Sequence, residues 1–427
     1  MRLLPFLACA ALAACSNDVE PRLIPGGGIG DGEIDGRVNV FVVDDADAPV
    51  GNATVRVGDK DVVTNEKGLA TFKDVSGPQT ISVKADGFRS AAWVAVDGAN
   101  VTIALEPQTP PLPDQATLSG TIPGWSTITV AQGHIKAGIV LFSQSDELGD
   151  PANDLKTPAN GNICGVIGTT CNWTLVSRTG PLTVVAMIVD RDTKGTVSEA
   201  DDTTTVIGWA TRNVTVEKGV GQSGLELAMV EAGNLETVAV DLGTPPAGLP
   251  QTTPIVGIEV SDDEVVQLPL FLATDKARLL APKPAVFGAD AAYRLTAIAQ
   301  TNAGDAGAQS IVLRRGQRTA SLAAGTWLVP PTGVTVTRTG ASFERVADAK
   351  VHSITWKDAN GRQLLDITLF DSTLTKVDVP SLVALPTSGT LTARVSGIGA
   401  DLNVRDFSLD RDADLLWGVA AQPVTIP

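Results

Sequence analysis

An acidic stretch over residues 190–202 carries the clearest set of side chains that could do chemistry. Calcium takes six to eight oxygen ligands, and a twelve-residue loop can supply them from positions 1, 3, 5, 7, 9 and 12. Counting from the first aspartate, oxygen atoms fall at positions 1, 3, 7, 9 and 12, from Asp190, Asp192, the Thr196 carbonyl, Ser198 and Asp201. Gly195 at position 6 allows the required turn.

Two features of this loop disagree with the calcium interpretation. Its spacing resembles a loop of the EF-hand type, but Lys194 stands at position 5, and Asp201 is shorter than the usual bidentate glutamate. Residues 182–189 also have a strand pattern rather than a helical one. The version that remains is a calcium loop framed by strands. The alternative is a solvated acidic hairpin loop without a metal.

Other catalytic chemistry lacks its usual residues. The chain has two histidines, His134 and His352, and no G-x-S-x-G, H-E-x-x-H or G-x-x-x-x-G-K-[ST] motif. The acidic run 262–264 could supply an acid and a base for glycoside hydrolysis, but adjacent carboxylates are typical of a solvated loop. A buried tryptophan is commoner than an exposed one, but an exposed tryptophan could stack on a sugar. The candidates for such stacking are Trp93, Trp125 and Trp209. We therefore predict that the protein is not an enzyme.

The N-terminus has the organisation of a secretory signal. Arg2 precedes an apolar run over residues 3–12 that is too short to span a membrane, and small residues follow. Residues 12–15, Leu-Ala-Ala-Cys, resemble the lipobox of bacterial lipoproteins. The resemblance implies removal of residues 1–14 and lipidation of Cys15. Because Ser16 rather than aspartate follows the cysteine, it also implies retention at the outer membrane.

The four cysteines divide by position. Cys9 leaves with the signal and Cys15 takes the lipid, which leaves Cys164 and Cys171 on either side of a glycine-containing loop. In an oxidising compartment such a pair is expected to form a local disulfide. A metal site would need further ligands nearby, which the two histidines do not supply.

Composition predicts strands and turns. Of 427 residues, 43% are hydrophobic but only 4% aromatic, and Gly and Pro number 42 and 26, which favours many short strands joined by turns. The formal net charge of −16 disfavours nucleic acid and anionic membrane surfaces as partners. No apolar run of about 18 residues follows the signal, so the lipid on Cys15 is the expected membrane attachment.

Residues 33–107 carry the best domain signal. Val38, Val40 and Val42 alternate with other residues at period two, and a turn ends at Gly68. Three segments resemble the carboxypeptidase regulatory-like domains, which are transthyretin-like β-sandwiches: residues 48–55 (APVGNATV), 64–72 (TNEKGLATF) and 81–88 (ISVKADGF). The resemblance implies a β-sandwich with an accessory role, and it brings no catalytic residues.

Composition shifts divide the rest of the chain. Residues 15–32 are polar and glycine-rich and predict a flexible tether, and the proline-rich residues 108–114 predict a linker. Residues 115–232 predict a second β-sandwich. Residues 233–427 predict a C-terminal β region, either one domain or two divided near residue 330.

These observations predict an all-β protein with tandem β-sandwich domains, immunoglobulin-like or transthyretin-like, after a lipoprotein signal peptide. The favoured function is a structural or interaction role at the outer membrane, on its periplasmic face or at the cell surface, for a protein or polysaccharide partner. One alternative is a carbohydrate- or surface-binding accessory or adhesin protein, which exposed tryptophans on a concave face would favour. Another is a hydrolase with an unrecognised carboxylate site. No cofactor is required, and calcium is the one candidate.

Substitution Cys15→Ser tests the lipid anchor. Because serine cannot form the thioether that holds the lipid, the variant should take up no fatty acid and should leave the membrane fraction. Metabolic labelling with a tagged fatty acid, followed by fractionation, measures both effects. Equal labelling of the wild type and the variant would exclude Cys15 as the modified residue.

Overall fold

The computed structural model describes residues 20–30, 32–109, 114–145, 162–196, 201–261, 264–268, 278–303, 307–401 and 416–427. The regular elements within these ranges are strands and short turns of 3₁₀ helix, named η1 (Trp125–Thr127), η3 (Ala232–Asn234), η5 (Pro284–Val286) and η7 (Ser381–Val383). No helix in this part of the chain is long and apolar enough to cross a membrane. The predicted all-β class with tandem β-sandwiches is confirmed.

Two facing sheets form the first sandwich. One has the order β4–β1–β7, from β4 (Leu69–Ser76), β1 (Asp35–Asp44) and β7 (Asn100–Leu105). The other contains β6 (Ser90–Val96), β5 (Gln79–Lys84), β2 (Thr54–Val57) and β3 (Lys60–Val63). Val38, Val40 and Val42 are fully buried in the shared core, because alternate residues of a strand point to the same face.

The second sandwich packs a five-stranded sheet against a three-stranded one. The first has the order β11 (Ile163–Cys164), β9 (His134–Phe142), β13 (Gly180–Asp192), β14 (Thr203–Val216), β16 (Ala228–Met229). The second has the order β12 (Asn172–Arg178), β8 (Gln115–Thr121), β15 (Gln222–Glu226). Strand β13 is apolar on both faces: Val184 enters this core, whereas Val185 and Met187 enter the next one. The second sandwich therefore shares a sheet with its neighbour.

Two more cores follow in the C-terminal region. In the third unit, β19 (Glu264–Leu268), β18 (Gln251–Ser261), β21 (Ala292–Gln300) and β22 (Gln309–Gln317) accompany a sheet of β20 (Arg278–Pro282), β17 (Leu235–Asp241) and β23 (Ser321–Ala323). The fourth unit comprises β30 (Leu416–Ile426), β29 (Leu391–Ala400), β26 (Val351–Asp358) and β27 (Gln363–Leu369) with β24 (Thr335–Val336), β25 (Gly340–Ser342) and β28 (Lys376–Asp378). Trp327 belongs to the core of the third unit and Val336 to the core of the fourth. The change from one core to the other therefore lies close to the boundary near residue 330 that the sequence left open.

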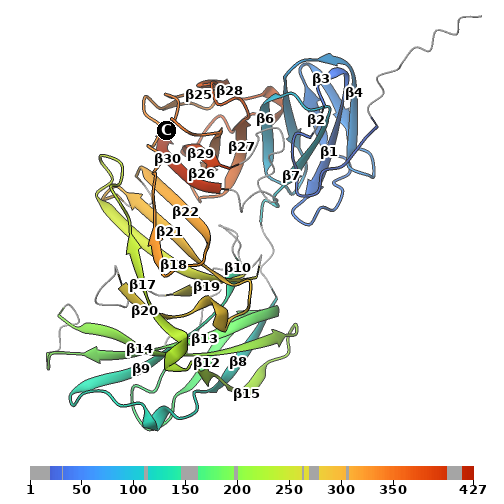
Figure 1. Cartoon of the computed structure of the whole chain (residues 1–427). Helices are drawn as coiled ribbons and strands as arrows, with labels where there is room; N and C mark the ends of the chain where they lie inside the picture. Colours follow the sequence, from blue (N-terminus) through green and yellow to red (C-terminus); the bar gives the residue numbers. More distant parts are fainter. Residues whose placement is uncertain are drawn as a thin grey trace, which may run out of the picture.

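One long sheet links the first, fourth and third units. It begins at β10 (Gln144–Ser145) and runs β19–β18–β21–β22–β30–β29–β26–β27–β6–β5–β2–β3. At its critical joint, here called the seam, β6 pairs in parallel with β27. Ala92 thereby enters the fourth core, whereas Trp93 packs against the first. Figure 1 shows the first and second sandwiches at opposite ends of the molecule, with the other units between them.

The segment before β1 is bound to the first sandwich, which differs from the flexible tether predicted over residues 15–32. Residues 20–30, here called the N-terminal strap, follow β7. Asn100 receives a hydrogen bond from the Arg22 amide at 3.2 Å and donates one to the Glu20 carbonyl at 3.1 Å. Gly28 and Thr102 exchange backbone hydrogen bonds at 2.8 Å. Residues 15–19 lie outside the described part of the chain.

Substitution Gly98→Ala tests the strap. An added Cβ at Gly98 would lie 1.6 Å from the Ile29 carbonyl oxygen, so the strap would have to move away. We expect a loss of about 1–3 kcal/mol in the stability of the first sandwich, the range for overpacking. Hydrogen exchange should show faster exchange at the Gly28 and Thr102 amides. Gly233→Ala is the matched control, because a Cβ there meets nothing within 4 Å, and unchanged exchange in Gly98→Ala would contradict the packing of the strap.

Candidate functional site

A polar cavity lies at the seam between the first sandwich and the fourth unit. Its volume is about 110 Å³. The smaller sheet of the first sandwich ends at its edge strand β7. The facing sheet continues past that edge, from β6 into β27, and the cavity lies at this step. The strap, a turn of the first sandwich, β6, the end of β7 and β27 line this seam cavity: Gly26, Gly27, Asp45, Arg89, Ser90, Ala91, Trp93, Ala104, Leu105, Glu106, Gln363, Asp366 and Thr368.

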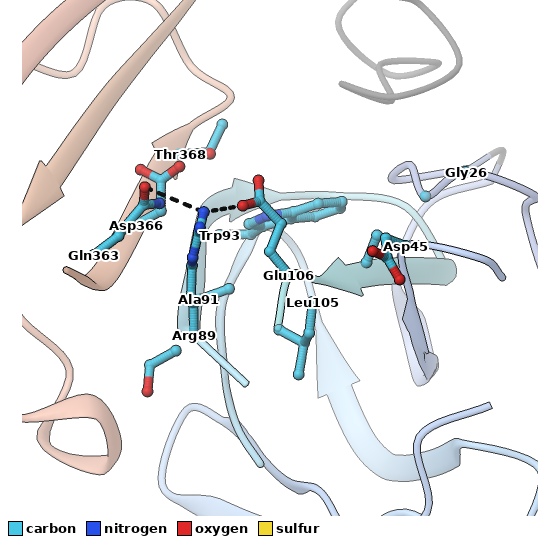
Figure 2. Close-up of a pocket in the computed structure, with 13 residues that line it drawn as sticks. Gly26, Asp45, Arg89, Ala91, Trp93, Leu105, Glu106, Gln363, Asp366 and Thr368 are labelled. Atoms are coloured by element: carbon cyan, nitrogen blue, oxygen red, sulfur yellow. Dashed lines mark hydrogen bonds and ion pairs between the residues drawn. The ribbon is translucent and has the colours of Figure 1, made fainter. Parts of the chain in front are cut away.

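Arg89 is the central cation of the seam cavity. Its Nη1 forms an ion pair with Glu106 and a long hydrogen bond of 3.4 Å to Oε1 of Gln363 (Figure 2). Its Nε is buried and has no hydrogen-bond partner, and burial lowers the pKa of the guanidinium. Glu106 is 63% exposed at the cavity rim. Arg89 therefore keeps donor capacity that the protein itself does not satisfy.

Asp366 supplies the innermost carboxylate. Burial raises the pKa of Asp366, while hydrogen bonds to its side chain oppose that shift. The hydroxyls of Ser353 and Thr355 donate to Oδ1 at 2.9 and 3.1 Å. Because residues of β26 hold the carboxylate and β27 carries it, Asp366 has a fixed position beside Arg89.

Trp93 forms the apolar part of the seam cavity. Its ring packs on Phe370, with ring centroids 5.0 Å apart, and it is only partly buried. Between Trp93 and Val96 the pairing of β6 with β5 shifts register, and Ala95 has a φ of 62°. A β-bulge re-aims nearby side chains, and a left-handed non-glycine residue costs roughly 1–3 kcal/mol. This local strain lies beside the one tryptophan that lines the cavity.

The sequence predicted no part of the seam cavity except Trp93. Trp125 and Trp209, the other two tryptophans considered for sugar stacking, are 2% and 1% exposed. Leu365 and Ile367 both point into the fourth core. Because side chains alternate along a strand, Asp366 between them lies on the opposite face of β27. An aspartate at mid-strand was the available signal, but the sequence did not show that β6 pairs with β27 beside that position.

The residues of the predicted calcium loop are only partly brought together. Nδ1 of His134 lies 2.7 Å from Oδ1 of Asp190, and Lys194 forms an ion pair with Asp192. The Thr196 hydroxyl donates to Asp201 at 2.9 Å. Ser198 lies outside the described residues. Within those residues no group of three or more His, Cys, Asp or Glu side chains has metal-binding geometry, and calcium binding stays a prediction.

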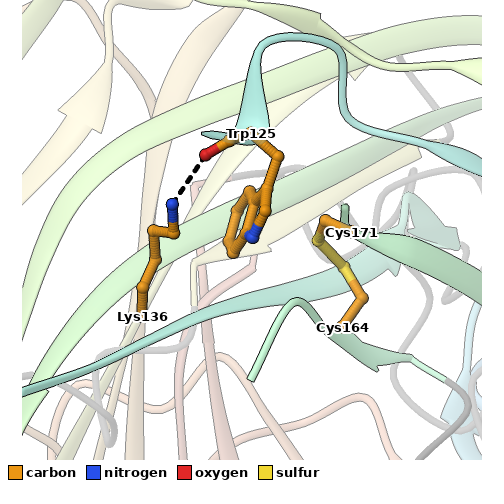
Figure 3. The surroundings of a disulfide bond; sticks show 4 residues. All are labelled: Trp125, Lys136, Cys164 and Cys171. Carbon is orange, nitrogen blue, oxygen red and sulfur yellow. Dashed lines mark hydrogen bonds between the residues drawn. A yellow bond between two sulfur atoms is a disulfide. The ribbon is translucent and has the colours of Figure 1, made fainter. Parts of the chain in front are cut away.

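The predicted disulfide is present. Cys164 and Cys171 are bonded, and both are buried in the core of the second sandwich (Figure 3). Gly165 packs directly on the Trp125 indole, where an added Cβ would lie 2.2 Å from the ring. Lys136 lies over the same ring and donates to the Trp125 carbonyl at 2.6 Å. This packing fixes a loop whose tip residue, Ile167, is 93% exposed.

Comparison with known proteins assigns no family. No protein-family model and no curated protein matches the chain. A candidate carbohydrate-binding protein from Bacteroides uniformis aligns with a TM-score of 0.13 and 10% identity, over 42% of this chain and 98% of that one. Two B repeat units of the collagen-binding protein of Staphylococcus aureus align with a TM-score of 0.12 and 10% identity, over 91% and 98%. Overlaps this weak carry no functional argument.

Removing the disulfide should destabilise the second sandwich. Replacing both cysteines by serine frees an eight-residue loop in the unfolded chain, which costs about 2.5 kcal/mol of stability in the chain-entropy model. Thermal unfolding of the double variant should show a lower melting temperature for this unit. A reductant should lower the melting temperature of the wild type and leave the double variant unchanged. An identical response of both proteins would mean that the bond does not form.

Proposed function

We propose that this chain is a saccharide-binding protein of the cell envelope, held at the outer membrane by a lipid on Cys15, and that its ligand occupies the seam cavity. The proposal is for binding without catalysis. The observation that carries it is the partly exposed Trp93 among polar side chains at the junction of two units. Cavities between domains are preferred places for ligands.

The polar lining matches the hydrogen-bonding needs of a sugar. Sugar hydroxyls both donate and accept, and the cavity offers carboxylates, a guanidinium, an amide and two hydroxyls: Asp45, Glu106, Asp366, Arg89, Gln363, Ser90 and Thr368. The planar groups of Arg89 and Glu106 can engage two neighbouring hydroxyls at once. Arg89 is the strongest of these donors, because its guanidinium is charged and charge-assisted hydrogen bonds are stronger than neutral ones.

Trp93 and the cavity volume limit what part of a ligand fits. The face of an indole ring packs well against the apolar face of a sugar ring. The volume of about 110 Å³ is somewhat below the roughly 150 Å³ of a cavity that holds benzene, and a sugar ring with its hydroxyls is larger than benzene. We therefore propose that one edge of a single sugar unit enters the cavity, while the rest of that unit and of a longer saccharide remains outside.

The lipid anchor would hold this cavity near the membrane. Gly26 and Gly27 of the strap belong to the cavity wall. An extended chain spans at most about 3.6 Å per residue, so the eleven steps from Cys15 to Gly26 cover at most about 40 Å. A lipid on Cys15 would place the cavity within that distance of the membrane surface, where envelope saccharides are exposed.

A protein-interaction role is the second candidate function. The loop closed by the disulfide favours this role. Val166 and Ile167 of the loop are 48% and 93% exposed, while Gly165 packs against the Trp125 ring and fixes the loop. A rigid apolar tip loses little conformational entropy when a partner covers it. The two roles are compatible, since the loop and the seam cavity lie in different units.

Substitution Trp93→Ala tests saccharide binding. Calorimetric titration of the full chain with neutral, amino and acidic oligosaccharides should reveal at least one ligand, and the variant should bind it about tenfold more weakly or worse, as expected when a stacking ring is lost. Trp417→Ala is the control, because Trp417 is also partly buried but packs in a separate core with Leu328. It should keep the wild-type affinity. Absence of binding across the panel, or unchanged affinity in Trp93→Ala, would contradict the proposal.

A further inference from the structure

The charges of the seam cavity are unequal. Three acidic residues, Asp45, Glu106 and Asp366, line it with a single basic residue, Arg89. Glu106 already pairs with Arg89, and these two charges offset each other. Arg89 also attracts the neighbouring Asp366, so Asp45 is the carboxylate left without a cation of its own in the cavity.

Asp45 and Asp366 differ in what surrounds them. Among the described residues no hydrogen bond or ion pair reaches the Asp45 carboxylate, which is exposed in the turn after β1. Asp366 accepts hydrogen bonds from Ser353 and Thr355, and burial raises the pKa of its carboxyl, which favours the neutral form. Asp45 is therefore the negative charge with the least compensation, and Trp93 lines the same cavity.

We propose that the seam cavity selects a saccharide carrying a free ammonium group, that is, an amino sugar that is not N-acetylated. An ammonium is attracted to a carboxylate and to the face of a tryptophan, and it has three donors for the acceptors of the cavity. A carboxylated sugar would instead bring a negative charge towards Asp45 and Glu106, which repel it. This inference rests on the proposed saccharide site and names its ligand class.

The experiment compares three probes of equal length on the full chain: a glucosamine tetramer, an N-acetylglucosamine tetramer and a galacturonate tetramer. We expect the glucosamine tetramer to bind at least about fivefold more tightly than the N-acetylated one, the size of one favourable cation–π contact or ion pair. The galacturonate tetramer should bind most weakly. Added salt should reduce the preference, since exposed charges are screened.

Two variants locate the source of the preference. Asp45→Asn should bring the affinities for the glucosamine and N-acetylglucosamine tetramers to within about twofold of each other, because it removes the uncompensated charge. Asp74→Asn makes the same change at an exposed residue of the first sandwich outside the cavity, and it should keep the wild-type preference. Equal affinity for both tetramers in the wild type, or an unchanged preference in Asp45→Asn, overturns the inference and leaves saccharide binding in place. Absence of binding by all three overturns the proposed function itself.

Discussion

The parallel pairing of β6 with β27 is the contact on which the arrangement of the units depends. It joins residues 90–94 to residues 365–369, which are far apart in the sequence. One short strand then serves two cores, with Ala92 in the fourth and Trp93 against the first. Side-chain contacts reinforce the joint, since Arg56 donates to the Ser381 hydroxyl at 2.6 Å and Arg362 to Gln108. The seam cavity exists because this joint prolongs one sheet of the first sandwich past the edge of the other.

Local signals in the sequence predicted the parts of the fold that local contacts determine. The alternation of Val38, Val40 and Val42 gave β1 and its buried face, because a strand has a period of two in any context. Gly68, with a φ of 69°, is where a turn residue was expected. Cys164 and Cys171 are close in sequence, so their pairing needed only an oxidising compartment. Each of these predictions required information from fewer than about ten neighbouring residues.

Features that depend on distant contacts were not predictable in this way. Residues 20–30 contain several glycines and read as a tether, yet the side chains of Asn100 and Thr102 bind that segment. Asn100 lies in an ordinary strand pattern, and nothing local marks it as a partner of Arg22. Asp366 similarly occupies the face of β27 that alternation assigns to solvent, but the pairing of β6 with β27 brings Arg89 and Glu106 into the same cavity as Asp366. The candidate site is made entirely of such contacts, which explains why sequence reasoning found only Trp93.

Stability alone does not account for the polar residues at the seam. An apolar side chain in place of a buried charge is often neutral or stabilising, so a joint optimised for strength would not need an aspartate at position 366. Asp366 could serve to fix the register of β26 and β27, since Ser353 and Thr355 both donate to its Oδ1. Register, however, does not require the unpaired Nε of Arg89 or the left-handed backbone of Ala95. Departures from local rules tend to gather at functional sites. Their presence around one cavity is the physical argument for treating the seam as a binding site as well as a joint.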